Sequence, residues 1–345
     1  MDLTKEKIIR RSNELALRAE GRTGTNPMVG ALLIRSGKII EEDWHHSFGG
    51  PHAEINVIQK AKDHTDFKHS ELAVSLEPCN HQGKTPACTD SILKHQIPAL
   101  LIDQIDPNSQ MSGKSLDDLK QQKISVTGPL STKTGARVLA PFYINTTQNR
   151  PYIVIKIAVS RDGYIGRPGG QIKISHPISD RWVHKIRSRL QGIMVGTNTI
   201  SNDNPSLIAR YHHQHNPIRI IPDRKGILDE DLRIFHLEDD QNIIFTTSDR
   251  SYSNARVIRM KDMSLPRLFR KLYDLNIGSL LIEGGSQLIR SVVKAELWDE
   301  WIQIQSKTIS LGQGIPAPPL PSLTPYFEKT LGTDNWKIIK TPALR

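Results

Sequence analysis

The two cysteines of this 345-residue chain are Cys79 and Cys88, and His52 lies upstream of them in the segment Pro51-His52-Ala53-Glu54. A catalytic zinc site needs three protein ligands and one open position for water, and one imidazole with two thiolates supplies the three. Side chains that bind one ion must lie within a few ångströms of one another. If these three residues bind one zinc ion, the fold must therefore bring three separate segments of the chain next to one another.

Glu54 lies two residues after His52, at the start of the same expected helix. Zinc lowers the pKa of a bound water toward about 7, and a nearby carboxylate can then carry protons from that water to a departing amine. A His-x-Glu segment followed by Pro-Cys is the signature of zinc-dependent deaminases. The pattern predicts that His52, Cys79 and Cys88 bind zinc and that Glu54 is the catalytic residue.

Other interpretations of the two cysteines stay open at this point. Cysteines nine residues apart could form a disulfide in a secreted chain, whereas in an intracellular chain such a pair is more often a metal site. A purely structural zinc site normally has four ligands, and His81 could be the fourth. That interpretation, a zinc-stabilised scaffold without catalysis, leaves the position of Glu54 unexplained.

The order of expected elements predicts the α/β fold class in both halves of the chain. In the first half we expect helices over residues 4–20, 52–62, 89–95 and 116–122, and strands over 29–34, 39–40, 72–76, 99–102 and 124–126. A polar linker is expected near residues 145–150. In the second half we expect helices over residues 179–190, 265–275 and 286–295, and strands over 152–159, 192–196, 218–221, 243–247, 279–282 and 301–309. The proline-rich stretch 314–321 is expected to be a loop.

The net charge of +10 is concentrated in the second half of the chain. Residues 1–150 carry 19 Lys and Arg against 17 Asp and Glu, and the remaining residues carry 27 against 19. A groove for long nucleic acid would charge the deaminase half itself, so this distribution disfavours a nucleic-acid-editing deaminase. We see no signal peptide, and no apolar run approaches the roughly 18 residues of a membrane helix, so we expect a cytoplasmic location and no membrane partner.

Several motifs together resemble the bacterial bifunctional riboflavin-biosynthesis deaminase/reductase family. In the first half they are residues 25–30, 44–45, 50–54, 76–89 and 106–108, including the wide loop between the two cysteines. In the second half they are residues 156–163, Arg187, 195–199, 203–210 and 282–286. The resemblance extends in order and spacing over nearly the whole chain.

The resemblance implies a cytidine-deaminase-like domain over residues 1–146 and a dihydrofolate-reductase-like domain over residues 150–345. It implies two successive reactions on a small-molecule substrate. A phosphoribosylated diaminopyrimidinone loses its ring amine at the zinc site, and its ribose is then reduced by NADPH to a ribityl chain. We also expect a homo-oligomer and no nucleic-acid partner. The alternative is a monofunctional deaminase whose second half is only a scaffold.

The resemblance also implies roles for individual residues. The first substrate would be held by Asn26, His45, Lys84, Asp106 and Asn108. The second substrate would be held by Lys156, Arg187, Asp203, Leu207, Arg210 and Glu283. NADPH would contact Ala158, Lys173, Thr199, Asp203, Arg224, Gly285 and Ser286. A purely structural interpretation stays open for two of these residues. Leu207 could belong to the core, and Arg187 could be a solvated charge on a helix.

The turn Glu283-Gly284-Gly285-Ser286 also fits a phosphate site, although alone it is a weak signal, because some such turns are only tight connections between a strand and a helix. It lies between an expected strand and an expected helix, and free amides at a helix N-terminus bind phosphate. The second half also departs from the family pattern at four positions. Lys173 replaces a tryptophan, Gln171 a small hydroxyl residue, Arg161 a leucine, and Asn204 the second of two aspartates.

Overall fold

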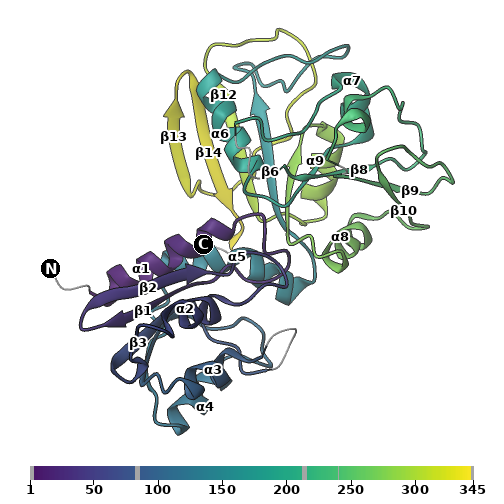
Figure 1. Ribbon diagram of the computed structural model, residues 1–345. Coiled ribbons are helices and arrows are strands. Elements are labelled where there is room, and N and C mark those ends of the chain that lie inside the picture. The colour runs from purple at the N-terminus through teal and green to yellow at the C-terminus, as the bar shows by residue number, and fades with distance from the viewer. Residues whose placement is uncertain (1–3, 82–85, 212–215, 240, 343–345) are drawn as a thin grey trace. The chain divides into compact units, whose positions relative to one another are not determined.

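The computed structural model describes residues 4–81, 86–211, 216–239 and 241–342. The chain divides into two compact units, Met1–Asn149 and Arg150–Arg345, and each is built on one sheet with helices (Figure 1). The predicted α/β class is confirmed in both units.

The sheet of the first unit has the strand order β2-β1-β3-β4-β5. β1 pairs antiparallel with β2 and β3, whereas β3, β4 and β5 run parallel. The strands are β1 (Gly30–Arg35), β2 (Lys38–Trp44), β3 (Ser70–Leu76), β4 (Ala99–Gln104) and β5 (Ser125–Thr127). The helices are α1 (Lys5–Ala16), α2 (Ala53–Ala61), α3 (Cys88–Lys94), α4 (Lys114–Gln121) and α5 (Lys133–Gln148).

Helices cover both faces of this sheet. Side chains alternate between the two faces along each strand, and apolar residues on both faces pack against helices. Leu33 and Val74 pack with Val57 of α2 and Ile92 of α3 on one face. On the other face, Leu32, Ala73 and Leu101 pack with Ile8, Ile9 and Leu15 of α1. Figure 1 shows α1 and α5 on the opposite side of the strands from α2, α3 and α4.

The sheet of the second unit has the order β10-β9-β8-β7-β11-β6-β12-β14-β13. The strands from β10 to β12 run parallel, and β14 and β13 close the far edge antiparallel. The strands are β6 (Tyr152–Val159), β7 (Gly192–Met194), β8 (Ile218–Pro222), β9 (Asn242–Thr246), β10 (Arg256–Arg259), β11 (Ser279–Glu283), β12 (Glu300–Ser306), β13 (Phe327–Leu331) and β14 (Asp334–Lys340). The helices are α6 (Pro177–Arg187), α7 (Thr197–Asp203), α8 (Leu265–Asp274) and α9 (Ser286–Lys294).

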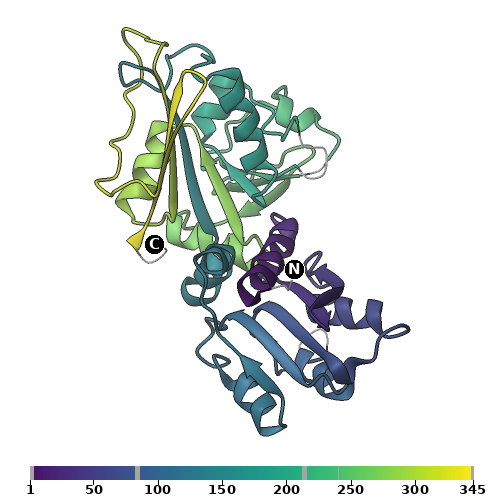
Figure 2. The ribbon, with the colours of Figure 1, turned by 90° about the vertical axis from the view of Figure 1, so that its left-hand side faces the viewer.

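The main core of the second unit lies between the sheet and helices α8 and α9. Ile153, Ile155 and Ile157 of β6 point into it, together with Phe269 of α8 and Ile289 of α9. The intervening residues of β6 face the other side, where Figure 2 shows α6 across the strands from α9. Because the parallel strands share a direction, the carboxyl ends of β6, β7, β8 and β11 lie along one edge, where α/β folds place their binding sites.

Each predicted helix and strand is confirmed, with displaced ends, and the proline-rich stretch 314–321 contains no helix or strand. The predicted linker over residues 145–150 is wrong, because the chain stays helical to Gln148 and ends the helix at Asn149 in a left-handed conformation. Helix α5 was not expected, since Gly135 and Pro141 lie inside it and both residues disfavour helix interiors. Gly135 is required there, because a Cβ would lie 1.8 Å from Oδ2 of Asp103.

Four further elements were not expected from the sequence: α7, β10, β13 and β14. The first three are short, and β13 is exposed along most of its length, so no period of buried residues marks it. Among the residues that the structure describes, no helix is long and apolar enough to cross a membrane.

A buried ion pair anchors the start of the second unit's sheet. The two Nη atoms of Arg150 donate to the carboxylate of Asp299 at 2.6 and 2.8 Å, and the Ile153 amide donates to the same carboxylate at 2.7 Å. Both charged side chains are buried. Arg150 lies two positions before β6 and Asp299 directly before β12, so the pair joins the starts of these two strands.

We predict that Asp299→Asn destabilises the second unit. The substitution leaves the Arg150 guanidinium buried without its counter-charge, which typically costs about 3–5 kcal/mol. Asp274 pairs with Arg270 at the surface of α8 and provides the matched control, so Asp274→Asn should cost less than about 1 kcal/mol. Thermal unfolding of both variants measures the difference, and equally small losses would contradict the anchoring role.

Candidate active sites

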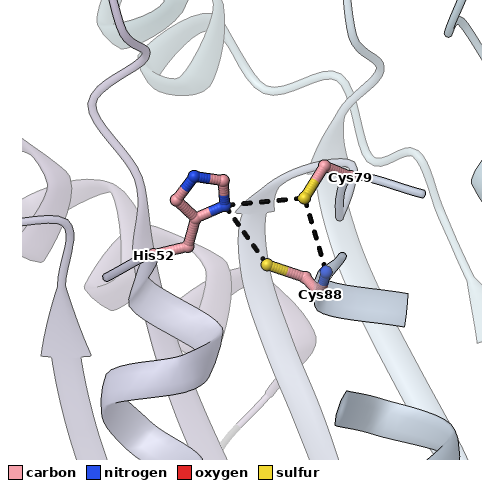
Figure 3. Close-up of side chains that lie close together, drawn as sticks. All are labelled: His52, Cys79 and Cys88. Carbon is pink, nitrogen blue, oxygen red and sulfur yellow. Dashed lines mark hydrogen bonds between the residues drawn. The ribbon is translucent and has the colours of Figure 1, made fainter. Parts of the chain in front are cut away.

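The three predicted zinc ligands come from the ends of three elements in the first unit (Figure 3). His52 is the N-cap residue of α2, Cys88 is the first residue of α3, and Cys79 follows the end of β3 by three positions. Each lies at the end of a helix or strand whose apolar side chains are held in the core, so their positions follow from packing on the sheet.

The ligand atoms are close enough to share one ion. Nδ1 of His52 lies 3.3 Å from Sγ of Cys88 and 3.5 Å from Sγ of Cys79. A tetrahedral zinc ion with ordinary bond lengths separates a nitrogen and a sulfur ligand by about 3.5 Å. Over residues 4–81, 86–211, 216–239 and 241–342, this is the one group of three or more His, Cys, Asp or Glu that could hold a metal ion.

His81, the alternative fourth ligand, is exposed and lies outside this group. Lys84, which the resemblance assigns to the first substrate, lies outside the described residues. Neither cysteine forms a disulfide. The three-ligand arrangement, with one position left for water, is therefore the one the geometry supports.

The thiols already differ in their affinity for protons. The hydrogen bond with Cys88, helped by His52, lowers the pKa of Cys79 to about 4 even though burial opposes this shift. The same contact with Cys79, together with burial, raises the pKa of Cys88. Because zinc binds the thiolate form, a cation at this point favours deprotonation of both.

Glu54 is buried in the first turn of α2, and its Oε2 has no hydrogen-bond partner within the described part of the chain. A buried carboxyl oxygen without a partner is costly, so it calls for an explanation. Burial raises the pKa of Glu54. A water ligand of a zinc ion on His52, Cys79 and Cys88 would supply the missing donor, so the residues fit a hydrated zinc ion.

Asn26 and His45 lie beside the ligand set. The His45 ring lies edge-on to the His52 ring, with centroids 5.6 Å apart. Burial lowers the pKa of His45, so we assign the neutral imidazole, with Nδ1–H donating to the Pro51 carbonyl at 2.9 Å. Nε2 then accepts from Nδ2 of Asn26 at 3.4 Å. The structure thus brings two of the predicted substrate residues to the zinc ligands.

Asp106 and Asn108 lie in the connection between β4 and α4. The Asn108 amide donates to Oδ1 of Asp106 at 2.8 Å, and burial raises the pKa of Asp106. The Asp106 amide in turn donates to Glu77, a buried residue that sequence reasoning missed. Its position directly before Pro78-Cys79 was the available signal.

In the second unit, a cluster of three charges lies at the carboxyl end of β11 and the neighbouring middle of β6. Lys156 and Glu283 are register partners on these strands, and their Nζ and Oε2 atoms lie 3.6 Å apart. Arg187 of α6 donates to both oxygens of Glu283, at 3.0 and 2.7 Å. Burial raises the pKa of Glu283, but the two cations outweigh it and bring the pKa to about 2. Arg187 is therefore not a solvated surface charge.

His184, one turn before Arg187 on α6, was also missed. Its side chain is buried, and Nε2 accepts from Nε of Arg210 at 3.1 Å. Burial lowers the pKa of His184 to about 4, helped by the neighbouring cations Arg187 and Arg210. The neutral ring therefore orients Arg210, and the histidine at this spacing from Arg187 was the only sequence signal.

The segment after α7 carries unusual backbone geometry. Asn204 and Leu207 adopt positive φ values of 41° and 53°, and such values in residues other than glycine concentrate at functional sites. Leu207 is buried and Asp203 half-buried, and burial raises the pKa of Asp203. Asparagine tolerates the left-handed conformation well, and Oδ1 of Asn204 also accepts from the Arg233 amide at 2.8 Å.

Gly284 and Gly285 form the turn between β11 and α9, both with positive φ. A Cβ on either glycine would lie 3.1 or 3.0 Å from the Thr199 side chain, so the turn packs closely against α7. No side chain caps the first amides of α9, and Oγ of Ser286 accepts from Arg290 at 3.0 Å. The turn therefore fits the phosphate site expected from the sequence.

The remaining predicted residues are more dispersed. Ala158 lies two residues beyond Lys156 on the same face of β6, and Arg224 is exposed after β8. Lys173 is exposed, with Nζ 3.7 Å from Asp180 of α6, and the substituted residues Gln171 and Arg161 are also exposed. Three of the four departures therefore lie at the surface of the second unit.

The two folds and their sites define a zinc-dependent deaminase joined to a reductase. The family model for the cytidine and deoxycytidylate deaminase zinc-binding region matches residues 3–103, and the model for the RibD C-terminal domain matches residues 151–325. The chain belongs to the RibD family of riboflavin biosynthesis proteins. It is a bifunctional enzyme whose deaminase half uses zinc and whose reductase half uses NADPH.

Known relatives match nearly the whole chain. The riboflavin biosynthesis protein RibD of Aquifex aeolicus is 31% identical over 309 residues, 87% of this chain and 86% of the relative. That of Actinobacillus pleuropneumoniae is 32% identical and covers 85% and 81%. The solved deaminase/reductase of Thermotoga maritima superposes with a TM-score of 0.87 at 31% identity, covering 97% of this chain and 98% of that one. The bifunctional interpretation is thus favoured over a deaminase with a scaffold.

We predict one zinc ion per chain, and its loss in Cys88→Ser, because a serine hydroxyl replaces one of only two thiolates. His81→Asn is the control, since this exposed histidine lies outside the cluster and zinc should be retained. Elemental analysis of the purified proteins measures the stoichiometry. Undiminished zinc in Cys88→Ser, or loss of zinc in His81→Asn, would contradict the three-ligand assignment.

Proposed function

We propose that the first unit deaminates a phosphoribosylated diaminopyrimidinone and that the second unit reduces the ribosyl group of the resulting uracil. The Thermotoga maritima protein is described as a diaminohydroxyphosphoribosylaminopyrimidine deaminase and phosphoribosylaminouracil reductase. The observation that carries the deaminase assignment is the unpartnered Oε2 of buried Glu54 beside His52, Cys79 and Cys88.

In the deamination step, Glu54 moves the protons. A zinc ion on His52, Cys79 and Cys88 supplies acidification of a water molecule when it is bound. The Glu54 carboxylate accepts a proton as the water oxygen bonds to the ring carbon, and then donates a proton to the amine nitrogen as ammonia leaves. Burial raises the pKa of this carboxyl, which favours the protonated form that donates to the amine.

Residues around the zinc ligands would hold the first substrate. Neutral His45 and the Asn26 amide lie beside the His52 ring, and Asp106 and Asn108 lie in the loop that Glu77 holds. These groups offer both donors and acceptors, which suits the amine and carbonyl edge of a pyrimidine. We assign Lys84 to the phosphoribosyl arm from the resemblance.

In the second unit, the charged cluster suits a phosphorylated and hydroxyl-rich sugar. Lys156, Arg187 and Arg210 supply cations, while Glu283 and Asp203 supply acceptors for hydroxyl groups. Bidentate pairing with Glu283 fixes the Arg187 guanidinium, and His184 fixes that of Arg210. Leu207 would close the site through its strained turn.

NADPH supplies a hydride when it is bound, and we propose that part of its site is the turn before α9. Ser286 and the Gly284-Gly285 turn would hold a phosphate on the amides of α9, with Thr199 packed against the turn. Ala158 would face the nicotinamide end beside Lys156, and Asp203, Arg224 and Lys173 would contact the remainder. We also propose the domain bounds 1–146 and 150–345, a homo-oligomer, and a cytoplasmic location.

We predict that Glu54→Gln retains zinc and loses deamination. The amide cannot accept a proton from water, and general acid–base catalysis typically contributes roughly 10²–10⁴-fold. Asp63→Asn, an exposed acidic residue just beyond α2, should leave turnover unchanged. Ammonia release by the zinc-loaded proteins is the assay, and near-normal turnover in Glu54→Gln would place the proton transfer elsewhere.

We predict that Lys156→Met lowers NADPH oxidation by about 10²-fold or more, because the reacting groups lose a charged contact that orients them. Deamination by the same protein should be unchanged. Lys294→Met at the exposed end of α9 is the matched control. Absorbance of NADPH is followed after the deaminated substrate is added, and full activity of Lys156→Met would exclude this lysine from the site.

A further inference from the structure

Glu77 is a buried carboxylate whose two oxygens accept hydrogen bonds from the loop that follows β4 and from the first turn of α4. Its Oε2 accepts from the amides of Asp106 and Gly113, at 3.1 and 2.9 Å. Its Oε1 accepts from the amide and the hydroxyl of Ser115, at 3.2 and 2.7 Å. Every one of these partners is a donor, so a carboxylate matches the site and an amide does not.

These donors lie at both ends of one loop, residues 105–113, which we call the substrate loop. Asp106 is near its start and Gly113 at its end, so one oxygen atom, Oε2, holds both ends together. The other oxygen caps the first turn of α4, where the amides have no intrahelical partners. Glu77 therefore determines the shape of the loop and its attachment to α4.

Glu77 also lies two residues before the zinc ligand Cys79, at the end of β3. Its own amide donates to the Gln104 carbonyl at 2.9 Å, which ties this point to the end of β4. The substrate loop starts directly after β4. A single short segment, Glu77-Pro78-Cys79, thus carries a ligand of the metal site and the anchor of the loop.

We propose that Glu77 is a positioning residue that sets the substrate loop against the zinc site, and so controls binding of the pyrimidine substrate. The inference rests on the proposed roles of Asp106 and Asn108 in holding that substrate. Within the loop, the Asn108 amide bonds to Asp106 and the Gln110 amide bonds to Oδ1 of Asn108, so the two side chains move with the loop backbone.

Asp103 provides a carboxylate of the same kind with a different task. It is buried on β4 and accepts from the Thr132 amide and hydroxyl, at 2.8 and 2.7 Å, and from Nδ2 of Asn13 at 2.7 Å. These partners belong to α1 and the start of α5. Asp103→Asn therefore perturbs a buried network of comparable size without touching the substrate loop.

The test compares zinc-loaded full-length Glu77→Gln and Asp103→Asn with the unsubstituted protein. Glu77→Gln turns one acceptor oxygen into an NH₂ donor, so two of the four bonds that hold the loop and α4 are lost. We expect KM for the diaminopyrimidine to rise about tenfold or more, with kcat within about threefold and zinc retained. Hydrogen exchange at the amides of Asp106, Gly113 and Ser115 should accelerate. Asp103→Asn should lower the melting temperature while leaving KM and these amides unchanged.

Ser115→Ala removes one of the four hydrogen bonds that Glu77 accepts and should raise KM to a smaller extent. This variant still tests the positioning role if Glu77→Gln does not fold. Unchanged KM in both variants, or an equal rise in Asp103→Asn, would overturn the positioning role.

Asn108→Ala distinguishes the proposed role of the substrate loop in substrate binding from the proposed positioning role of Glu77. If it leaves KM unchanged, the assignment of the loop to the substrate fails. If it raises KM while Glu77→Gln does not, the inference about Glu77 alone fails.

Discussion

A buried carboxylate must find donors or cations within the protein, and this constraint organises both units. Asp299 is paired with Arg150 at the start of a sheet, and Glu283 with Arg187 and Lys156 at the end of β11. The oxygens of Glu77 accept hydrogen bonds from the substrate loop and from Ser115 in the first turn of α4. Among the described residues, Oε2 of buried Glu54 has no hydrogen-bond partner, and neither has Oδ1 of buried Asp334, whose other oxygen accepts from the His176 amide. Glu54 differs from Asp334 because it lies beside His52, Cys79 and Cys88. Glu54 is therefore the residue that we propose for proton transfer.

The two sites are built on the same physical basis although their chemistry differs. In each unit, parallel strands end along one edge, and polar side chains at these ends meet helix N-termini. In the deaminase half, His52 is the N-cap residue of α2 and Cys88 is the first residue of α3, so the N-termini of both helices lie at the candidate metal site. In the reductase half, the Gly284-Gly285 turn follows β11 directly, so the first amides of α9 lie at the end of the strand that pairs with β6 beside Lys156. Apolar packing positions the helices, and the sites follow.

The sequence predicted the α/β class, the order of most elements and that His52, Cys79 and Cys88 come together, because these depend on local periodicity and on rare residue types in a specific spacing. It did not predict α5, since Pro141 and Gly135 oppose a helix locally and only packing near Asp103 explains the glycine. Glu77 and His184 were missed for a related reason. Their partners lie far along the chain, in the substrate loop and at Arg210, and a charged or polar residue gives no local sign of such contacts.

We infer that one chain performs deamination and reduction in succession, and that its two active sites act one after the other on the same pyrimidine. Mass spectrometry of the product, after incubation of the zinc-loaded protein with the diaminopyrimidine substrate, tests this most directly. Without NADPH, the product should have exchanged its ring amine for an oxygen and retained the ribosyl ring. With NADPH, the same product should have gained two further hydrogen atoms in its sugar. A deaminated product whose mass is unchanged by NADPH would contradict the account.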